Sequence, residues 1–174
     1  MNLNQLLVRA ARSFPDRVAI SHGTANYCDY ATLARRAAGL GGAMGTSLGL
    51  KPGDRVGLFM TNTPEYLEAF HGALHAGMTA LPINNKLHEK ELAYILDDAG
   101  AGVVFTTPDL AEKAAKGVEI TGSKARVIVV GEAEYVIRSI WSRRPMMIWP
   151  GSSTPPAQPA IPRERCCPIA ISGR

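Results

Sequence analysis

The chain has 174 residues, of which 46% are hydrophobic and 20% are charged. These values are typical of a globular protein with a core of its own. The sequence has no apolar run near the ~20 residues that span a bilayer, and no secretory leader at its N-terminus. We therefore expect a cytoplasmic protein without an integral membrane segment. Three cysteines are too few for a disulfide scaffold.

The net charge of +4 is concentrated at one end of the chain. Residues 136–174 contain six arginines and a single acidic residue, Glu164, whereas residues 1–135 are almost neutral. Seven of the 12 prolines also lie at or after Pro145. Two different compositions are thus joined near residue 135. The arginines are sparse and have no interleaved stacking aromatics, so we expect no nucleic-acid partner.

The first part of the chain predicts two helices separated by two strands. Residues 2–11 fit a helix with Asn2 as N-cap and an apolar face of Leu3, Leu6, Leu7 and Ala10. "RVAIS" and "NYCDY" are short strand patterns. From Tyr30 a longer helix follows, with a face formed by Leu33, Ala37, Leu40 and Met44.

The second part alternates strands with helices. "RVGLFM" is an almost continuous apolar strand, of the kind that is buried on both faces of a parallel sheet. Thr63 and Pro64 then begin a helix with a predicted stripe of Leu67, Phe70 and Leu74.

Three further strand patterns follow, "TALPIN", "AGVVFTT" and "ARVIVVG". A helix with the stripe Leu92, Ile95, Leu96 and Ala99 lies between the first two, and Thr107 with Pro108 begins another before the third. The alternation predicts βαβ crossovers, so we assign an α/β fold with a mostly parallel sheet and flanking helices.

Two glycine-containing stretches resemble nucleotide-binding loops but lack essential features. "GLGGAMG", residues 39–45, has Met44 at the third glycine position of the dinucleotide fingerprint and lies inside a helical pattern. "GVEITGSK", residues 117–124, has the glycine spacing of a P-loop, but its serine and lysine are in the reverse order. We interpret the first as close helix packing and the second as a turn before a strand.

The remaining candidate residues also favour structural roles. His71 and His75 have a spacing that can bind zinc, but no third ligand is near in sequence. Cys28 and the adjacent Cys166 and Cys167 match no zinc spacing. The pair of aspartates at 97–98 has the character of a solvated helix end. We assign no catalytic, cofactor-binding or metal-binding residue to this chain.

Residues from about Leu3 to Gly131 resemble the start of the adenylate-forming (AMP-binding) superfamily, as found in acyl-CoA synthetases and 4-coumarate–CoA ligases. The resemblance rests on "YATLARRAAGLGGAM" and on the order "GDRV…N-x-PEYL…AG…PIN…L…EL-x-YIL". "PINNKL" is similar to acyl-CoA synthetases, and Thr32 stands where the family usually has glutamate. The resemblance implies the N-terminal part of a large α/β domain that uses ATP, Mg²⁺ and CoA on a carboxylic, notably fatty, acid.

In that family the phosphate loop, the ribose-binding aspartate and the catalytic lysine all lie downstream of the resembling segment. The position of the phosphate loop is occupied here by "MMIWPGSSTPP". We therefore ask what the same coding sequence could specify in a shifted reading frame, in which the third base of each codon joins the first two bases of the next. This reading forces aspartate at the Met146–Met147 junction and alanine at the Trp149–Pro150 junction. From Pro145 to Ser172 the genetic code then permits D-D-D-L-A-W-L-F-Y-T-S-G-T-T-G-N-P-K-G-A-M-L-S-H-R-N-L, which contains such a loop.

These observations give a principal hypothesis and two alternatives. In the first, residues 1–135 are the N-terminal part of an acyl-CoA synthetase domain, and residues 136–174 are an out-of-frame, disordered tail. This chain would then be inactive by itself. A second is a non-catalytic α/β binding module with a Pro-rich interaction tail. A third is a small flavodoxin-type nucleotide-binding enzyme, for which "SHGTANY" is a poor phosphate loop.

Overall fold

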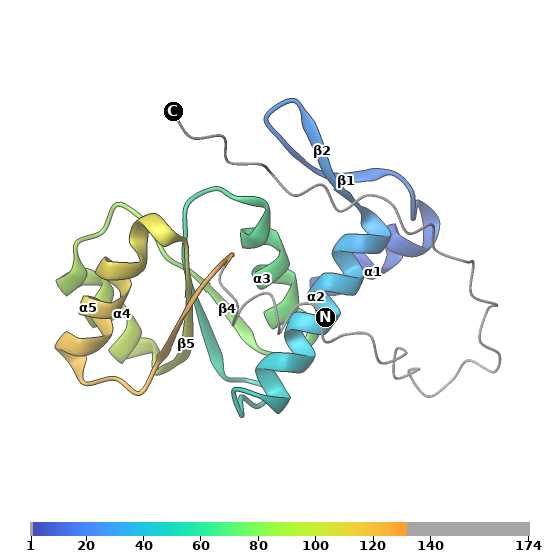
Figure 1. The fold of residues 1–174 in the computed structure, drawn as a ribbon. Coiled ribbons are helices and arrows are strands. Elements are labelled where there is room, and N and C mark those ends of the chain that lie inside the picture. The colour runs from blue at the N-terminus through green and yellow to red at the C-terminus, as the bar shows by residue number, and fades with distance from the viewer. Residues whose placement is uncertain (1, 132–174) are drawn as a thin grey trace.

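The computed structural model describes residues 2–131, so the predictions made for residues 136–174, including Cys166 and Cys167, lie outside it. Within this range the chain forms an antiparallel hairpin and a parallel sheet flanked by helices (Figure 1). The hairpin pairs β1 (Val18–His22) with β2 (Ala25–Asp29). The α/β prediction is confirmed.

The parallel sheet has the strand order β4-β3-β5-β6. Its strands are β3 (Arg55–Phe59), β4 (Thr79–Pro82), β5 (Ala101–Thr106) and β6 (Arg126–Val129). The helices are α1 (Asn4–Ser13), α2 (Tyr30–Thr46), α3 (Pro64–His75), α4 (Glu89–Ala99) and α5 (Ala111–Thr121), with a short 3₁₀ turn, η1 (Pro108–Leu110), before α5. None of these helices is long and apolar enough to cross a membrane.

The sheet is covered on both faces (Figure 1). Alternate side chains of β3, including Val56 and Leu58, pack in one cluster with residues of α2 and α3. Phe59 of the same strand belongs to a second cluster, with residues of α4 and α5. This explains why the β3 and β5 sequences are apolar almost throughout, as a strand buried on both faces requires.

Helices α2 and α3 approach each other at two glycines. A Cβ atom placed on Gly41 would lie 2.6 Å from the carbonyl oxygen of Gly72, and one on Gly72 would lie 3.2 Å from that of Ala37. The "GLGGAMG" stretch therefore serves close helix packing, as predicted. The predicted α2 face is also confirmed, since Leu33, Ala37, Leu40 and Met44 are all buried.

The predicted apolar stripe of α3 is wrong in part: Phe70 is partly buried and packs against the cluster shared with α2, as predicted, but Leu67 does not. Leu67 is 39% exposed, and the residues buried on this helix include Glu68, Ala69, Gly72 and Ala73. The close contact with α2 leaves room only for small side chains, so the large ones lie to the side of it.

The predicted face of α1 is also wrong in part. Leu3 and Leu6 are 48% and 53% exposed, and the side chains that dock are Leu7 and the polar Asn4. The helix begins at Asn4 rather than directly after Asn2. The Oδ1 atom of Asn2 nevertheless accepts a hydrogen bond from the Asn4 N–H at 2.9 Å, so this side chain still caps the first turn.

Replacing Gly41 with alanine should destabilise the protein by about 1–3 kcal/mol, because the added methyl group would overlap the Gly72 backbone. Gly42 lies next to it in the same helix and has open space around its Cβ position. Gly42→Ala should therefore be neutral or stabilising by up to ~1 kcal/mol, through helix propensity. Urea unfolding followed by circular dichroism measures both changes, and equal midpoints for the two variants would refute this account of the helix contact.

Candidate functional site

The direction of the crossovers reverses between β3 and β5. From β3 the chain passes through α3 to β4 on one side, and α4 then carries it back across β3 to β5. The carboxyl ends of β3 and β5 therefore lie side by side, with loops that diverge to opposite faces of the sheet. In open α/β sheets, ligands bind at this kind of topological switch point.

Threonine side chains meet at this switch point. The Oγ1 atom of Thr107, after β5, accepts hydrogen bonds from the N–H and the hydroxyl of Thr61, after β3, at 3.3 and 3.2 Å. Thr106 and Thr107 are buried. The sequence pattern identifies Thr107 only as a helix start, although a Thr-Thr pair at the end of a buried strand is the signal that could have identified this cluster.

A hollow of about 270 Å³ lies beside the cluster, between β1 and the start of α3. It is lined by Ile20 and His22 of β1, by Asn62 and Thr63 of the loop after β3, and by Tyr66 and Leu67 of α3. Thr63 is the N-cap of α3 as predicted, but its hydroxyl makes no capping hydrogen bond. The Thr63 Oγ1 atom is buried and has no hydrogen-bond partner within residues 2–131.

These loops do not by themselves fit a nucleotide triphosphate. Residues 60–64 and 106–110 contain no lysine or arginine, and phosphate cradles use such cations together with backbone N–H groups. The Thr61–Thr107 hydroxyls are also bonded to each other. Among residues 2–131, no cluster of three or more histidine, cysteine, aspartate or glutamate side chains could hold a metal ion.

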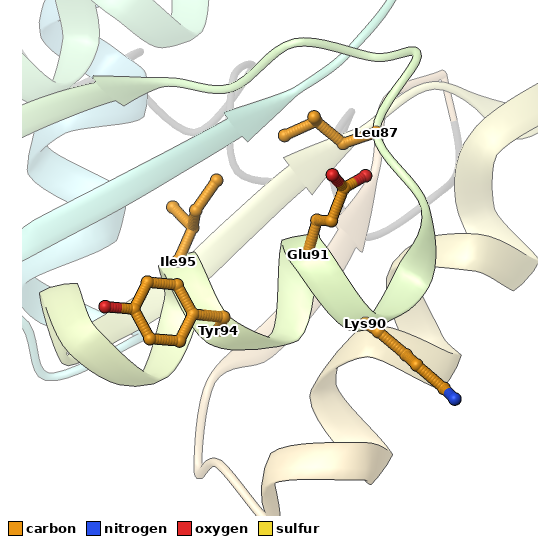
Figure 2. Close-up of a pocket in the computed structure, with 5 residues that line it drawn as sticks. All are labelled: Leu87, Lys90, Glu91, Tyr94 and Ile95. Atoms are coloured by element: carbon orange, nitrogen blue, oxygen red, sulfur yellow. The ribbon is translucent and has the colours of Figure 1, made fainter.

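A second hollow lies on the outer surface of α4, and its lining does not converge (Figure 2). Lys90 points away from Tyr94 and Ile95, which lie one turn further along the helix. The Oε2 atom of Glu91 accepts a hydrogen bond from the His88 N–H at 2.9 Å, completing a capping box. This hollow is a feature of the α4 surface and has no convergent polar groups.

An ion pair between the partly exposed Arg36 and the buried Glu68 fastens the hairpin to α2 and α3. The Arg36 guanidinium donates to Glu68 Oε1 at 2.7 Å and lies over the Tyr27 ring, whose hydroxyl is 3.2 Å from the same oxygen. Burial, with the Glu68 and Glu65 carboxylates, raises the pKa of the Tyr27 phenol far above its ordinary value. Glu68 is 2% exposed, and the Arg36 guanidinium is the cation that accompanies its carboxylate below the surface. We assign this cluster a structural role.

His71 and His75 hold α1 rather than a metal. His71 Nδ1 lies 3.1 Å from Asn4 Oδ1, and Asn4 Nδ2 lies 3.2 Å from His75 Nδ1. With the Asn4 amide in this orientation, Nδ1 of His71 donates to Asn4 and Nδ1 of His75 accepts from it. Burial lowers the pKa of both rings.

The remaining sequence candidates are separate from one another and from the switch point. The turn predicted for residues 117–124 is confirmed only at its end: Gly117 lies within α5, which runs to Thr121, and Gly122 ends the helix in a left-handed conformation (φ 61°). Cys28 is a half-buried free thiol whose pKa is raised by burial. Asp97 and Asp98 are exposed near the end of α4.

The family model of the AMP-binding enzymes matches residues 7–162. The chain belongs to this family. The matched range also runs past residue 135, and the boundary placed there by composition stays a prediction.

Several relatives carry ligase names. A feruloyl-CoA synthase from Amycolatopsis sp. is 40% identical over 108 residues, which are 62% of this chain and 22% of that protein. A long-chain-fatty-acid–CoA ligase, FadD13 of Mycobacterium tuberculosis, is 45% identical over 60 residues, or 12% of its length. The chain thus spans only a small part of these enzymes. An uncharacterized protein of M. tuberculosis, Rv1549, is 37% identical over 118 residues, which are 65% of its own length.

Solved structures show the same architecture. The N-terminal domain of FACL13 from M. tuberculosis superimposes with a TM-score of 0.70 at 27% identity, covering 83% of this chain and 36% of that domain. A benzoate CoA ligase from Burkholderia xenovorans has a TM-score of 0.68 at 23% identity and covers 80% of this chain and 28% of its own, which shows the fold alone. The described unit therefore corresponds to part of the N-terminal domain of adenylate-forming enzymes.

Replacing Thr107 with valine should destabilise the protein by about 1–2 kcal/mol, because it removes the acceptor of the Thr61 N–H. Thr106→Val is the matched control. The Thr106 hydroxyl makes only a long, 3.4 Å hydrogen bond to the Thr107 carbonyl, which also accepts from the Leu110 N–H. Thermal unfolding compares the two variants, and an equal loss in both would show that the Thr61–Thr107 contact is not what stabilises the switch point.

The His71–Asn4–His75 bridge predicts lower stability in acid. The pKa of each ring is lower in the folded chain than the ordinary value of about 6.5, so the unfolded chain binds protons more readily. Stability should be full above pH ~6.5 and should fall as the pH drops below it. In the variant His71→Gln/His75→Gln the amides supply a donor and an acceptor that do not titrate. We expect its urea midpoint to change less between pH 7.5 and 5.5 than that of the wild type; an unchanged pH dependence would assign the effect to other groups.

Proposed function

We propose that this chain is the N-terminal portion of an ATP-dependent acid–CoA ligase. In the full reaction a carboxylic acid and ATP form an acyl-adenylate with release of pyrophosphate, and CoA then accepts the acyl group as a thioester. The observation that carries the proposal is the similarity to the FACL13 N-terminal domain over 83% of this chain, at 27% identity. The names of the relatives, a feruloyl-CoA synthase and long-chain-fatty-acid–CoA ligases, support the substrate class of an aromatic or fatty acid. Cytoplasmic location and the use of ATP, Mg²⁺ and CoA belong to the same proposal.

In this proposal residues 2–131 provide the scaffold and not the chemistry. The threonines at the switch point are bonded to each other, and the loops around them lack a cation for phosphate. The nucleotide would therefore be held by the phosphate loop that the family carries downstream. We further propose that this loop is encoded in the shifted frame after Tyr135, and that the chain as written is inactive by itself.

The purified chain, incubated with ATP, Mg²⁺, CoA and ferulate or palmitate, should release no pyrophosphate and form no thioester, since the loops at the switch point lack a cation for the nucleotide phosphates. A graft tests the positive part of the proposal. Residues 2–131 should replace the corresponding region of the Amycolatopsis feruloyl-CoA synthase and leave an enzyme that forms feruloyl-CoA, measured by absorbance and chromatography.

The same synthase with this region deleted is the control for the graft and should be inactive. Thioester formation by the chain alone would contradict its predicted inactivity. A folded graft that forms no feruloyl-CoA would contradict the proposed role of residues 2–131.

A further inference from the structure

The two outer strands of the parallel sheet differ in what they offer to a further strand. In β4, the N–H of Thr79 bonds to the Asp54 carbonyl at 2.8 Å, and that of Ile83, just after the strand, bonds to the Leu58 carbonyl at 3.0 Å. Because successive residues of a strand point their N–H groups to opposite sides, Ala80 and Pro82 face outward. Proline has no N–H, so the outward side of β4 has a single donor, on Ala80.

The outward side of β6 is not blocked in this way. The N–H of Val130 bonds to the Thr106 carbonyl at 2.8 Å, so the alternation turns Val127 and Val129 outward. Both have an N–H group, and the segment Val127–Ile128–Val129 consists of β-branched residues with no charge and no proline. Natural sheets protect a true outer strand with proline, charge or shortness. Both strands are four residues long, so length does not distinguish them. Within residues 2–131, β4 has a proline in its outward row, whereas the outward residues of β6 are neither proline nor charged.

We propose that the β6 edge binds a β-strand from the remaining portion of an AMP-binding domain, and that the two portions associate when they are made as separate chains. This inference rests on the proposed function. The outward N–H groups of Val127 and Val129 would donate to the added strand, as in other cases of β-strand addition.

The comparisons favour this occupant over others. The chain covers 36% of the FACL13 N-terminal domain, so most of that domain lies outside the equivalent of this unit. The AMP-binding match extends beyond β6, to residue 162, so the family domain continues after this strand. In Rv1549, moreover, the matched region makes up 65% of the protein, so this portion is also the major part of another chain.

The test mixes the full 174-residue chain with the Amycolatopsis feruloyl-CoA synthase from which the corresponding region has been deleted. We expect the two chains to co-elute in size-exclusion chromatography and to form feruloyl-CoA together. Amide hydrogen exchange gives a direct readout of the edge: the Val127 and Val129 amides should exchange rapidly in the chain alone and become protected in the complex.

A matched pair of proline substitutions distinguishes the two edges. Val127 and Ala80 are each the second residue of a four-residue strand, and each has its N–H on the outward side. Val127→Pro should weaken the complex at least about tenfold, equivalent to ~1.4 kcal/mol, in isothermal titration. Ala80→Pro should leave the affinity within about twofold. Circular dichroism of both variants checks that the fold is kept; if Val127→Pro does not fold, the exchange measurement on the wild type decides.

The outcomes separate this inference from the proposed function. If the covalent graft is active but the separate chains do not associate, the inference is overturned and the proposed function stands. If the graft is folded and inactive, the proposed function fails. Equal weakening by the two prolines, or unprotected Val127 and Val129 amides in the complex, would place the interface elsewhere. A homodimer that is lost in Val127→Pro would make a second copy of this chain the occupant and would also overturn the inference.

Discussion

The backbone contact between α2 and α3 is the constraint on which the rest of the structure depends. A Cβ atom on Gly41 would overlap the Gly72 backbone, and one on Gly72 would have little room beside the Ala37 carbonyl. At this helix separation the Arg36 guanidinium of α2 lies 2.7 Å from Glu68 of α3. The pair in turn holds Tyr27, and with it the hairpin, against the start of α3. A wider crossing would leave the Glu68 carboxylate buried without its cation, at a cost of several kcal/mol.

The contacts of α1 and α3 also explain which buried helix faces can be predicted from the sequence and which cannot. The strands and the α2 and α4 faces were predictable, because their burial is dictated by apolar side chains at regular spacing. In α1 and α3 the buried positions include Asn4 and Glu68, which are tolerated only because partners distant in sequence satisfy them. Periodicity assigns polar residues to the solvent, so it identified Leu7 and Phe70 but misplaced the rest of the docking faces of α1 and α3.

The switch point was missed for a related reason. Thr61 and Thr107 are 46 residues apart and meet only because the crossover from β4 returns across β3. Local patterns identify each threonine as a turn or cap residue, and nothing in either segment indicates the other. The family resemblance supplied the fold and the expected chemistry, but it could not show that the hydroxyls at this edge are bonded to each other.

Both faces of the sheet are thus covered, and among residues 2–131 no strand pairs with the outer side of β6. The cluster under α2 and α3 and the cluster under α4 and α5 each contain residues with no exposed surface, among them Val56, Phe105 and Leu96. Because helices cover both faces of the sheet, residues 2–131 bury apolar side chains in the way that a small domain does. An edge formed by Val127 and Val129 adds main-chain donors to that unit without adding a face that needs covering. Folding of the unit therefore relies on side chains buried between its layers. The proposed pairing with a further strand relies on different groups, the backbone N–H groups along β6.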